Sequence, residues 1–171
     1  MNELKISGEI AAVYTDIENP ERFSVGYIVA LTEEQMLMLH IGLHGEMDGY
    51  SVNNLDDVYR IETDSKYINK IKALCSFNPD EAFKIAITDN LLTDLLNAAV
   101  TRRCIADVDL IGDRVIGYVE KVVEGKVYME QIDDYGEYDG HTVFLCSDIC
   151  AASIEDTECK VIDMLYKRNK K

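Results

Sequence analysis

A short acidic sequence occurs twice in the chain, as GEMDGY at residues 45–50 and as GEYDGH at residues 136–141. Two carboxylates beside glycines could form a cation-binding loop or a pair of catalytic acids. Asp-Gly is also a strong signal for a tight turn, because glycine accepts a positive φ without steric cost. The recurrence favours the turn. The acidic residues of both copies are also candidates for contact with a partner at the loop tips: Glu46, Asp48, Glu137 and Asp139.

Cysteine and histidine near the C-terminus have the side-chain types that zinc prefers: His141, Cys146, Cys150 and Cys159. No second close cysteine pair completes a zinc pattern. An offset of 91 residues places Tyr50, Leu55 and Tyr59 where His141, Cys146 and Cys150 stand. Apolar and aromatic equivalents indicate that these cysteines fill a core as free thiols, so we expect no metal and no cofactor.

Other candidate sites give weaker signals for catalysis. His40 and His44 lie on a strand and loop rather than on a helix, and they are interpreted as surface or rim histidines. The stretch at residues 107–113, DVDLIGD, lacks the final bidentate glutamate of a calcium loop. No nucleophile elbow or phosphate-binding loop is present. We therefore predict a protein that is not an enzyme, unless a pocket gathers carboxylates that are distant in sequence.

Tyr27 and Tyr118 follow the same glycine in both copies, which leaves two interpretations open. They could form an aromatic groove for a peptide, or they could pack at the edge of a core. The second interpretation is favoured.

The chain has 171 residues and a formal net charge of −15. This charge disfavours nucleic acid and anionic membranes and favours a basic protein partner. No apolar run is long enough to cross a bilayer, and the first ten residues do not resemble a secretion signal. We expect a cytoplasmic location with reduced cysteines.

The repeated hexapeptide belongs to a longer duplication. Residues 24–58 align with residues 115–149 without a gap, and 11 of 35 positions are identical. Each copy predicts five short strands that bend and close on themselves, with Ile61-Glu62 matching Ile154-Glu155 after a two-residue slip. Ile41 and Ile132 fall on the opposite parity from Met38 and Met129, which predicts a bulge between them.

Comparison of the copies identifies a second buried face. Leu37 and Leu39 in copy one correspond to Tyr128 and Glu130 in copy two. We therefore predict that the two leucines pack against a helix, the other copy or a second chain, which makes them candidate contact residues.

Three helical segments are expected. Residues 63–65 and residues 156–157 supply caps for a helix after each copy, with apolar residues at helical spacing. A connector at residues 76–101 should hold one helix starting near Pro79 and another capped by Thr88 or Asp89. Its leucine-rich face should pack on the copies.

The stretch VGYIVALTEEQMLML at residues 25–39 resembles the first motif of the Sm-like group of SH3-type barrels, with a glycine, alternating apolar residues, a polar turn and an apolar strand. Residues 26–67 are also similar to a group of bacterial proteins without a known activity. The Sm-like group contacts RNA through an asparagine near the first turn and an Arg-Gly step near the end. This chain has Glu-Glu-Gln at residues 33–35 and Tyr-Arg-Ile-Glu at residues 59–62. The resemblance implies the barrel and not the RNA-contacting residues.

These observations predict a mainly β protein with helices, built from two tandem five-stranded SH3-type barrels, each followed by a helix. Copy one with its helix spans residues 1–75, the helical connector spans 76–101, and copy two with its helix spans 102–171. The expected function is a protein-interaction or scaffold module, with association between copies of the chain also expected. Two alternatives are an Sm-like RNA-binding protein and an acidic mimic that inhibits a nucleic-acid-binding protein.

Overall fold

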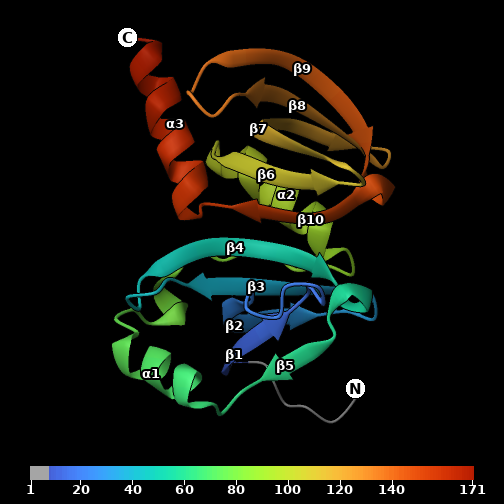
Figure 1. Ribbon diagram of the computed structural model, residues 1–171. Helices are drawn as coiled ribbons and strands as arrows, with labels where there is room; N and C mark the ends of the chain where they lie inside the picture. Colours follow the sequence, from blue (N-terminus) through green and yellow to red (C-terminus); the bar gives the residue numbers. More distant parts are fainter. Residues whose placement is uncertain (1–7) are drawn as a thin grey trace.

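The computed structural model describes residues 8–171, and all ten of its strands join one antiparallel open sheet (Figure 1). Copy one contributes β1 (Ile10–Tyr14), β2 (Ser24–Leu31), β3 (Gln35–Ile41), β4 (Met47–Asn54) and β5 (Arg60–Glu62). Copy two contributes β6 (Ile105–Leu110), β7 (Asp113–Val123), β8 (Lys126–Ile132), β9 (Tyr138–Leu145) and β10 (Ile149–Ile154). The helices are α1 (Lys66–Leu74), α2 (Leu91–Arg102) and α3 (Thr157–Asn169), and short 3-10 turns are η1 (Leu55–Asp57), η2 (Pro79–Glu81) and η3 (Cys146–Asp148).

The prediction of two closed barrels is wrong. The strand order is β5-β1-β2-β3-β4-β10-β6-β7-β8-β9, so β4 of copy one pairs with β10 of copy two. We call this β4–β10 junction the seam; in it Ser51 lies opposite Ser153 and Val52 lies opposite Ala152. Closing copy one on itself would require β4 to pair with β5, which has three residues and pairs with β1. The longer β10 occupies the edge of β4 instead, and β5 and β9 are left as the two outer strands.

The duplication extends without a gap through the last strand of each copy. The third residue of β1 lies opposite Glu62, and the third residue of β6 lies opposite Ser153. Glu62 and Ser153 are therefore equivalent and keep the offset of 91. The predicted match of Ile61 with Ile154 is wrong by two residues, because the strand register makes Glu62 equivalent to Ser153 although Ile-Glu occurs at both places.

The repeated acidic sequence has two structural parts, a turn and a bulge. The chain reverses at residues 42–46 and 133–137, where Gly45 and Gly136 have φ of 86° and 73°. A Cβ on either glycine would overlap the backbone or side chain of the helix that ends its own copy. The Asp-Gly step lies beyond the turn, inside β4 and β9, rather than at the turn as expected.

The bulge predicted from the isoleucine parity is confirmed in both copies. The β3–β4 register shifts between Leu39 and Ile41, and the β8–β9 register shifts between Glu130 and Ile132. The glycine of the Asp-Gly step supports each shift with a positive φ. The extra residue lies in β4 and in β9, so Ile41 keeps the sheet face of Leu39 and packs with Tyr27, while Ile132 keeps the face of Glu130 and packs with Tyr118.

Helix α2 packs between the copies. Leu37 and Leu39 are 0% and 1% exposed and belong to the same apolar cluster as Leu95 and Leu96 of α2. This is the helix packing that the comparison of the copies predicts. The other side of α2 contacts the inner face of copy two, which includes Val108, Val119, Val127 and Met129. The inner face of copy one lies on the opposite side of the sheet, as a separate cluster around Met36 and Met38.

The helix caps are mostly those expected. Ser65 accepts a hydrogen bond from Ile68 N at 3.2 Å, and Asp156 accepts one from Cys159 N at 2.8 Å. Asn90, rather than Thr88 or Asp89, caps α2. The expected helix after Pro79 is only the 3-10 turn η2. Among residues 8–171, no helix has the length and apolar character needed to cross a bilayer.

Candidate functional site

A polar pocket of about 270 Å³ lies on the seam, on the sheet face opposite α2. Four aspartates distant in sequence line it: Asp48, Asp107, Asp109 and Asp156. The remaining lining residues are Ser24, His40, Ser51, Asn53, Ala151, Ala152 and Ser153. Its volume is near the lower end of ligand pockets, which are on the order of 300–1,000 Å³. The sequence predicts no enzyme unless a pocket gathers carboxylates that are distant in sequence. This pocket meets that condition.

Pairing of β4 with β10 at the seam brings the polar residues together, because rows of directly opposed residues then continue from the strands of copy one onto those of copy two. One row runs from Met38 through Ser51 and Ser153 to Asp107. Because directly opposed residues share a sheet face, the apolar inner face of copy one continues as a polar surface on copy two. In a neighbouring row, Asp109 lies opposite Ala151, and Ala151 lies opposite Asn53 of β4, so Asp109 reaches the same pocket. Neither copy could form this pocket alone.

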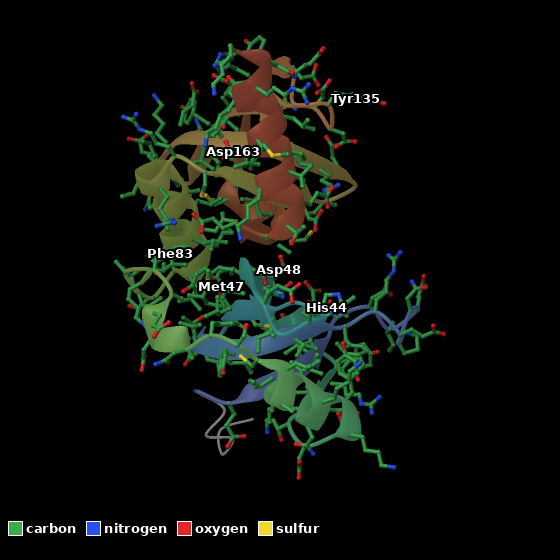
Figure 2. All side chains as sticks on the ribbon, turned by 90° about the vertical axis from the view of Figure 1, so that its left-hand side faces the viewer. His44, Met47, Asp48, Phe83, Tyr135 and Asp163 are labelled. Carbon is green, nitrogen blue, oxygen red and sulfur yellow. The ribbon has the colours of Figure 1, made fainter. Side chains whose placement is uncertain are left out.

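Asp48 and Asp156 are held at the beginning of α3. Asp48 Oδ1 accepts hydrogen bonds from Thr157 N at 2.8 Å and from Thr157 Oγ1 at 2.7 Å. Asp156 Oδ2 accepts a hydrogen bond from Ser153 Oγ at 2.6 Å. Figure 2 shows Asp48 below the lower end of α3, with His44 beside it on the same side of the molecule. The helix N-terminus stabilises both carboxylates. Both oxygens of Asp156 accept hydrogen bonds, from Ser153 and from Cys159, whereas Asp48 Oδ2 accepts none within residues 8–171.

His40 and Ser51 line the pocket and contact each other. His40 Nε2 lies 2.6 Å from Ser51 Oγ, and Asn53 Nδ2 donates to the same Oγ at 3.2 Å. Burial lowers the pKa of His40, although the carboxylates of Asp48 and Asp156 act in the opposite direction. The ring is therefore neutral at pH 7 and does not balance the charge of the aspartates.

The β6 side of the pocket contains one neutralised carboxylate and one free carboxylate. Arg114 Nε donates to Asp107 Oδ1 at 2.8 Å, and its guanidinium also contacts Glu158. Within residues 8–171, the Asp109 side chain has no hydrogen bond and no salt bridge. Asp109 is an exposed residue. The partial loss of solvent around its carboxylate raises the pKa of Asp109, Asp107 raises it further, and Arg114 lowers it. A cation in the pocket would relieve this unfavourable environment of the Asp109 carboxylate.

A groove of about 430 Å³ adjoins the pocket and shares Ser24, His40 and Asp48 with it. The groove adds an aromatic wall, because the rings of Phe23 and Tyr67 meet edge to face at 5.3 Å. The pocket and the groove together form one surface with an acidic end and an aromatic end.

The two matched tyrosines lie between a sheet and a helix. Tyr118 donates to Asp163 of α3, and its ring lies 5.3 Å from that of Tyr166. The Tyr27 hydroxyl lies 3.7 Å from Cys75 Sγ, and burial raises the pKa of Tyr27 to about 12, with Cys75 contributing. Each tyrosine fixes the helix that follows its own copy. They do not form a common aromatic groove.

The other candidate residues have separate environments. Glu46 accepts a hydrogen bond from His44 N at 2.9 Å inside its own turn, and Glu137 is exposed. Leu37 and Leu39 are covered by α2. Asp48 is the one residue of this set that lines the seam pocket, while its equivalent Asp139 is exposed.

The sequence indicates Asp107 and Asp109 only as part of a disfavoured calcium loop and Asp156 only as a helix cap, so their role in this pocket was missed. A signal existed, because Asp107 and Asp109 occupy positions that Ala12 and Tyr14 hold in copy one. A polar residue that replaces an apolar equivalent inside a strand indicates a surface specific to that copy. The aligned range at residues 115–149 did not reach β6.

The cysteines form no disulfide, and no cluster suited to a metal ion occurs within the described residues 8–171. Burial raises the pKa of Cys104 to about 11, with Glu155 contributing. Burial also raises the pKa of Cys159. These thiols remain protonated at pH 7 and are poor nucleophiles.

No protein-family model, no curated protein and no solved structure matches this chain at a significant level.

Proposed function

We propose that this protein is a non-enzymatic interaction module that binds an extended basic segment of a protein partner at the seam. A lysine or arginine side chain enters the polar pocket, and a neighbouring apolar residue lies against Phe23 and Tyr67 in the groove. The observation that carries the proposal is the Asp109 carboxylate, which lines the pocket together with Asp107 and has no salt bridge among residues 8–171.

The charge of the site and of the whole chain supports a basic ligand. Three of the four aspartates lack a cationic partner among residues 8–171, since Arg114 contacts Asp107. A neutral His40 adds no positive charge. The overall charge of −15 attracts basic partners at long range and repels phosphate backbones. The five free thiols favour the reducing cytoplasm as the location.

The proposal is tested with two short capped peptides that differ in one side chain. The first has a lysine beside a phenylalanine, and the second has norleucine in place of the lysine. Calorimetric titration should show at least about tenfold weaker binding of the norleucine peptide, because it lacks the charge-assisted hydrogen bonds. Equal affinity for the two peptides, or no binding of either, contradicts the proposal.

Asp109→Asn is the variant of choice, because Asp48 and Asp156 also cap α3 and their loss would disturb the fold. It should weaken binding of the lysine peptide about tenfold. Asp134→Asn is the matched control, because Asp134 is an exposed aspartate in the β8–β9 turn. A similar loss for both variants would indicate long-range attraction without a pocket.

A second candidate function is hydrolysis by a serine, which the 2.6 Å contact between His40 Nε2 and Ser51 Oγ favours. A neutral histidine beside a serine hydroxyl is the beginning of a nucleophile and base pair. Ser51 is only 8% exposed, which limits access of a substrate. Labelling by a fluorophosphonate probe, lost in Ser51→Ala, would establish the hydrolase. Absence of labelling in the folded protein would exclude it.

A further inference from the structure

The two outer strands of the sheet are the repeat equivalents of the two strands that pair at the seam. Strand β9 is equivalent to β4, and β5 is equivalent to β10. Inside the molecule, β4 pairs with β10. We propose that β9 of one molecule pairs with β5 of a second copy of this chain, so that the sheet continues head to tail from molecule to molecule.

Strand β9 presents an apolar surface that its equivalent buries. Val143 is 53% exposed, whereas Val52 at the equivalent position of β4 is 2% exposed. Tyr138 and Leu145 of β9 are 58% and 46% exposed. An eight-residue edge strand without lysine or proline also offers unpaired backbone groups to another strand. Strand β9 therefore offers both the apolar side chains and the backbone groups that pairing with another strand requires.

The seam supplies the register of the proposed contact. Val52 lies opposite Ala152 and Ser51 lies opposite Ser153. The offset of 91 residues makes Val143 equivalent to Val52 and Ile61 equivalent to Ala152, so Ile61 of one molecule would lie opposite Val143 of the next. In the same way, Glu62 would lie opposite Thr142.

Charge complementarity supports the same register. Asp48 accepts hydrogen bonds from Thr157, the first residue of α3. Its equivalent Asp139 would meet Lys66, the first residue of α1 in the second copy. The helix N-terminus and the lysine ammonium both favour a carboxylate at this place. Neither Asp139 nor Lys66 has a salt bridge within residues 8–171.

A matched pair of glycines fits the same contact. A Cβ on Gly49 would overlap the backbone of Ile154 and Asp156, so β10 approaches β4 only because this residue is glycine. Its equivalent Gly140 has a φ of 99° and open space around it. The open space at Gly140 is where the chain of the second copy would approach.

The acidic pocket would not be repeated at the new contact. The positions of Asp107 and Asp109 are occupied in copy one by Ala12 and Tyr14. Assembly and ligand binding are therefore separate properties that can fail separately. Each molecule has one β9 and one β5, so the contact is heterologous and generates a ring or a filament.

Light scattering over a wide range of concentration tests the assembly. As the protein concentration increases, the measured molecular mass should rise from 19.3 kDa to an integer multiple of that value. Gly140→Asn should weaken association at least about tenfold, because asparagine tolerates a positive φ but fills the space that the seam keeps empty. Gly125→Asn is the control, since Gly125 also has a positive φ and open surroundings but lies in the β7–β8 turn.

A mixing experiment distinguishes pairing of β9 with β5 from a dimer in which β9 pairs with β9 of the second copy. Lys66→Glu and Asp139→Lys each place like charges together and should weaken self-association several-fold. A mixture of the two variants restores opposite charges at every contact and should assemble like the native chain. A native protein that stays at 19.3 kDa at every concentration overturns the proposal. Unchanged assembly of Gly140→Asn, or a mixture no better than its components, also overturns it.

Discussion

Strands β4 and β9 occupy the same position in the two copies, yet their environments are opposite. Val52 of β4 is 2% exposed because α2 covers one face and β10 occupies the edge, whereas Val143 of β9 is 53% exposed. The same turn and the same bulge precede both strands. Local sequence therefore determines the turn and the bulge of each strand, and contact with the neighbouring copy determines whether the strand is buried and paired on both sides. In copy one the strand carries the seam pocket, and in copy two it remains a free edge.

The largest difference between the copies is expected at the two bulge glycines. Gly49→Ala places a Cβ on the backbone of β10 at a positive φ, and the loss of unfolding free energy should be on the order of 4 kcal/mol. Gly140→Ala meets only the backbone strain, about 1–2 kcal/mol. Urea denaturation in dilute solution measures both. Equal losses would show that β10 does not approach Gly49.

The next difference concerns the face that α2 covers. Leu39→Ala opens a cavity under α2 and should lower the free energy of unfolding by about 2–5 kcal/mol. Its equivalent Glu130→Ala removes a hydrogen bond from Tyr166, worth about 1 kcal/mol. The same denaturation experiment compares them. A larger loss at Glu130 would contradict the assignment of the buried second face to copy one.

A smaller difference is expected at the paired aspartates. Asp48→Ala removes two hydrogen bonds from the first residue of α3 and should lower the free energy of unfolding by about 1 kcal/mol. Asp139→Ala in the dilute monomer should change it by less than about 0.5 kcal/mol. Circular dichroism during thermal unfolding measures the two variants. If Asp48→Ala is as neutral as Asp139→Ala, the carboxylate does not cap α3.

The smallest effect concerns pH and the histidine of the pocket. Because burial lowers the pKa of His40 in the folded state, the folded protein binds this proton less readily than the unfolded chain does. The contribution of His40 to stability is complete above the unfolded pKa of about 6.5 and is lost as pH falls below it. His40→Gln installs the residue found at the equivalent Gln131 and should reduce this acid-side slope. An unchanged slope of stability against pH would show that His40 is solvated.

Sequence could predict the local features of this fold. The identity of the copies located most of the strands, the parity of Ile41 predicted the bulge, and Ser65 predicted the beginning of α1. The exchange of Leu39 for Glu130 predicted a second buried face in copy one. Each inference depends on neighbouring residues or on a comparison at a fixed offset.

The arrangement of the strands could not be obtained in this way. Whether β4 pairs with β5 or with β10 depends on contacts about a hundred residues apart, and the short β5 carries little pattern. The pocket depends on this pairing, because Asp109 meets the residues of β4 only across β10. Asp48 was recognised as a candidate without the carboxylates that accompany it.

Hydrogen exchange of the β4 and β9 backbone amides, followed from dilute to concentrated solution, tests the central claim most directly. An open sheet with head-to-tail edges predicts that β4 and β10 amides exchange slowly at every concentration, since both strands are paired on both sides. The outward amides of β9 and β5 should exchange fast in dilute solution and slow down as molecules associate. Equal protection of β9 and β4 in dilute solution, or exchange of β9 that does not depend on concentration, would contradict the account.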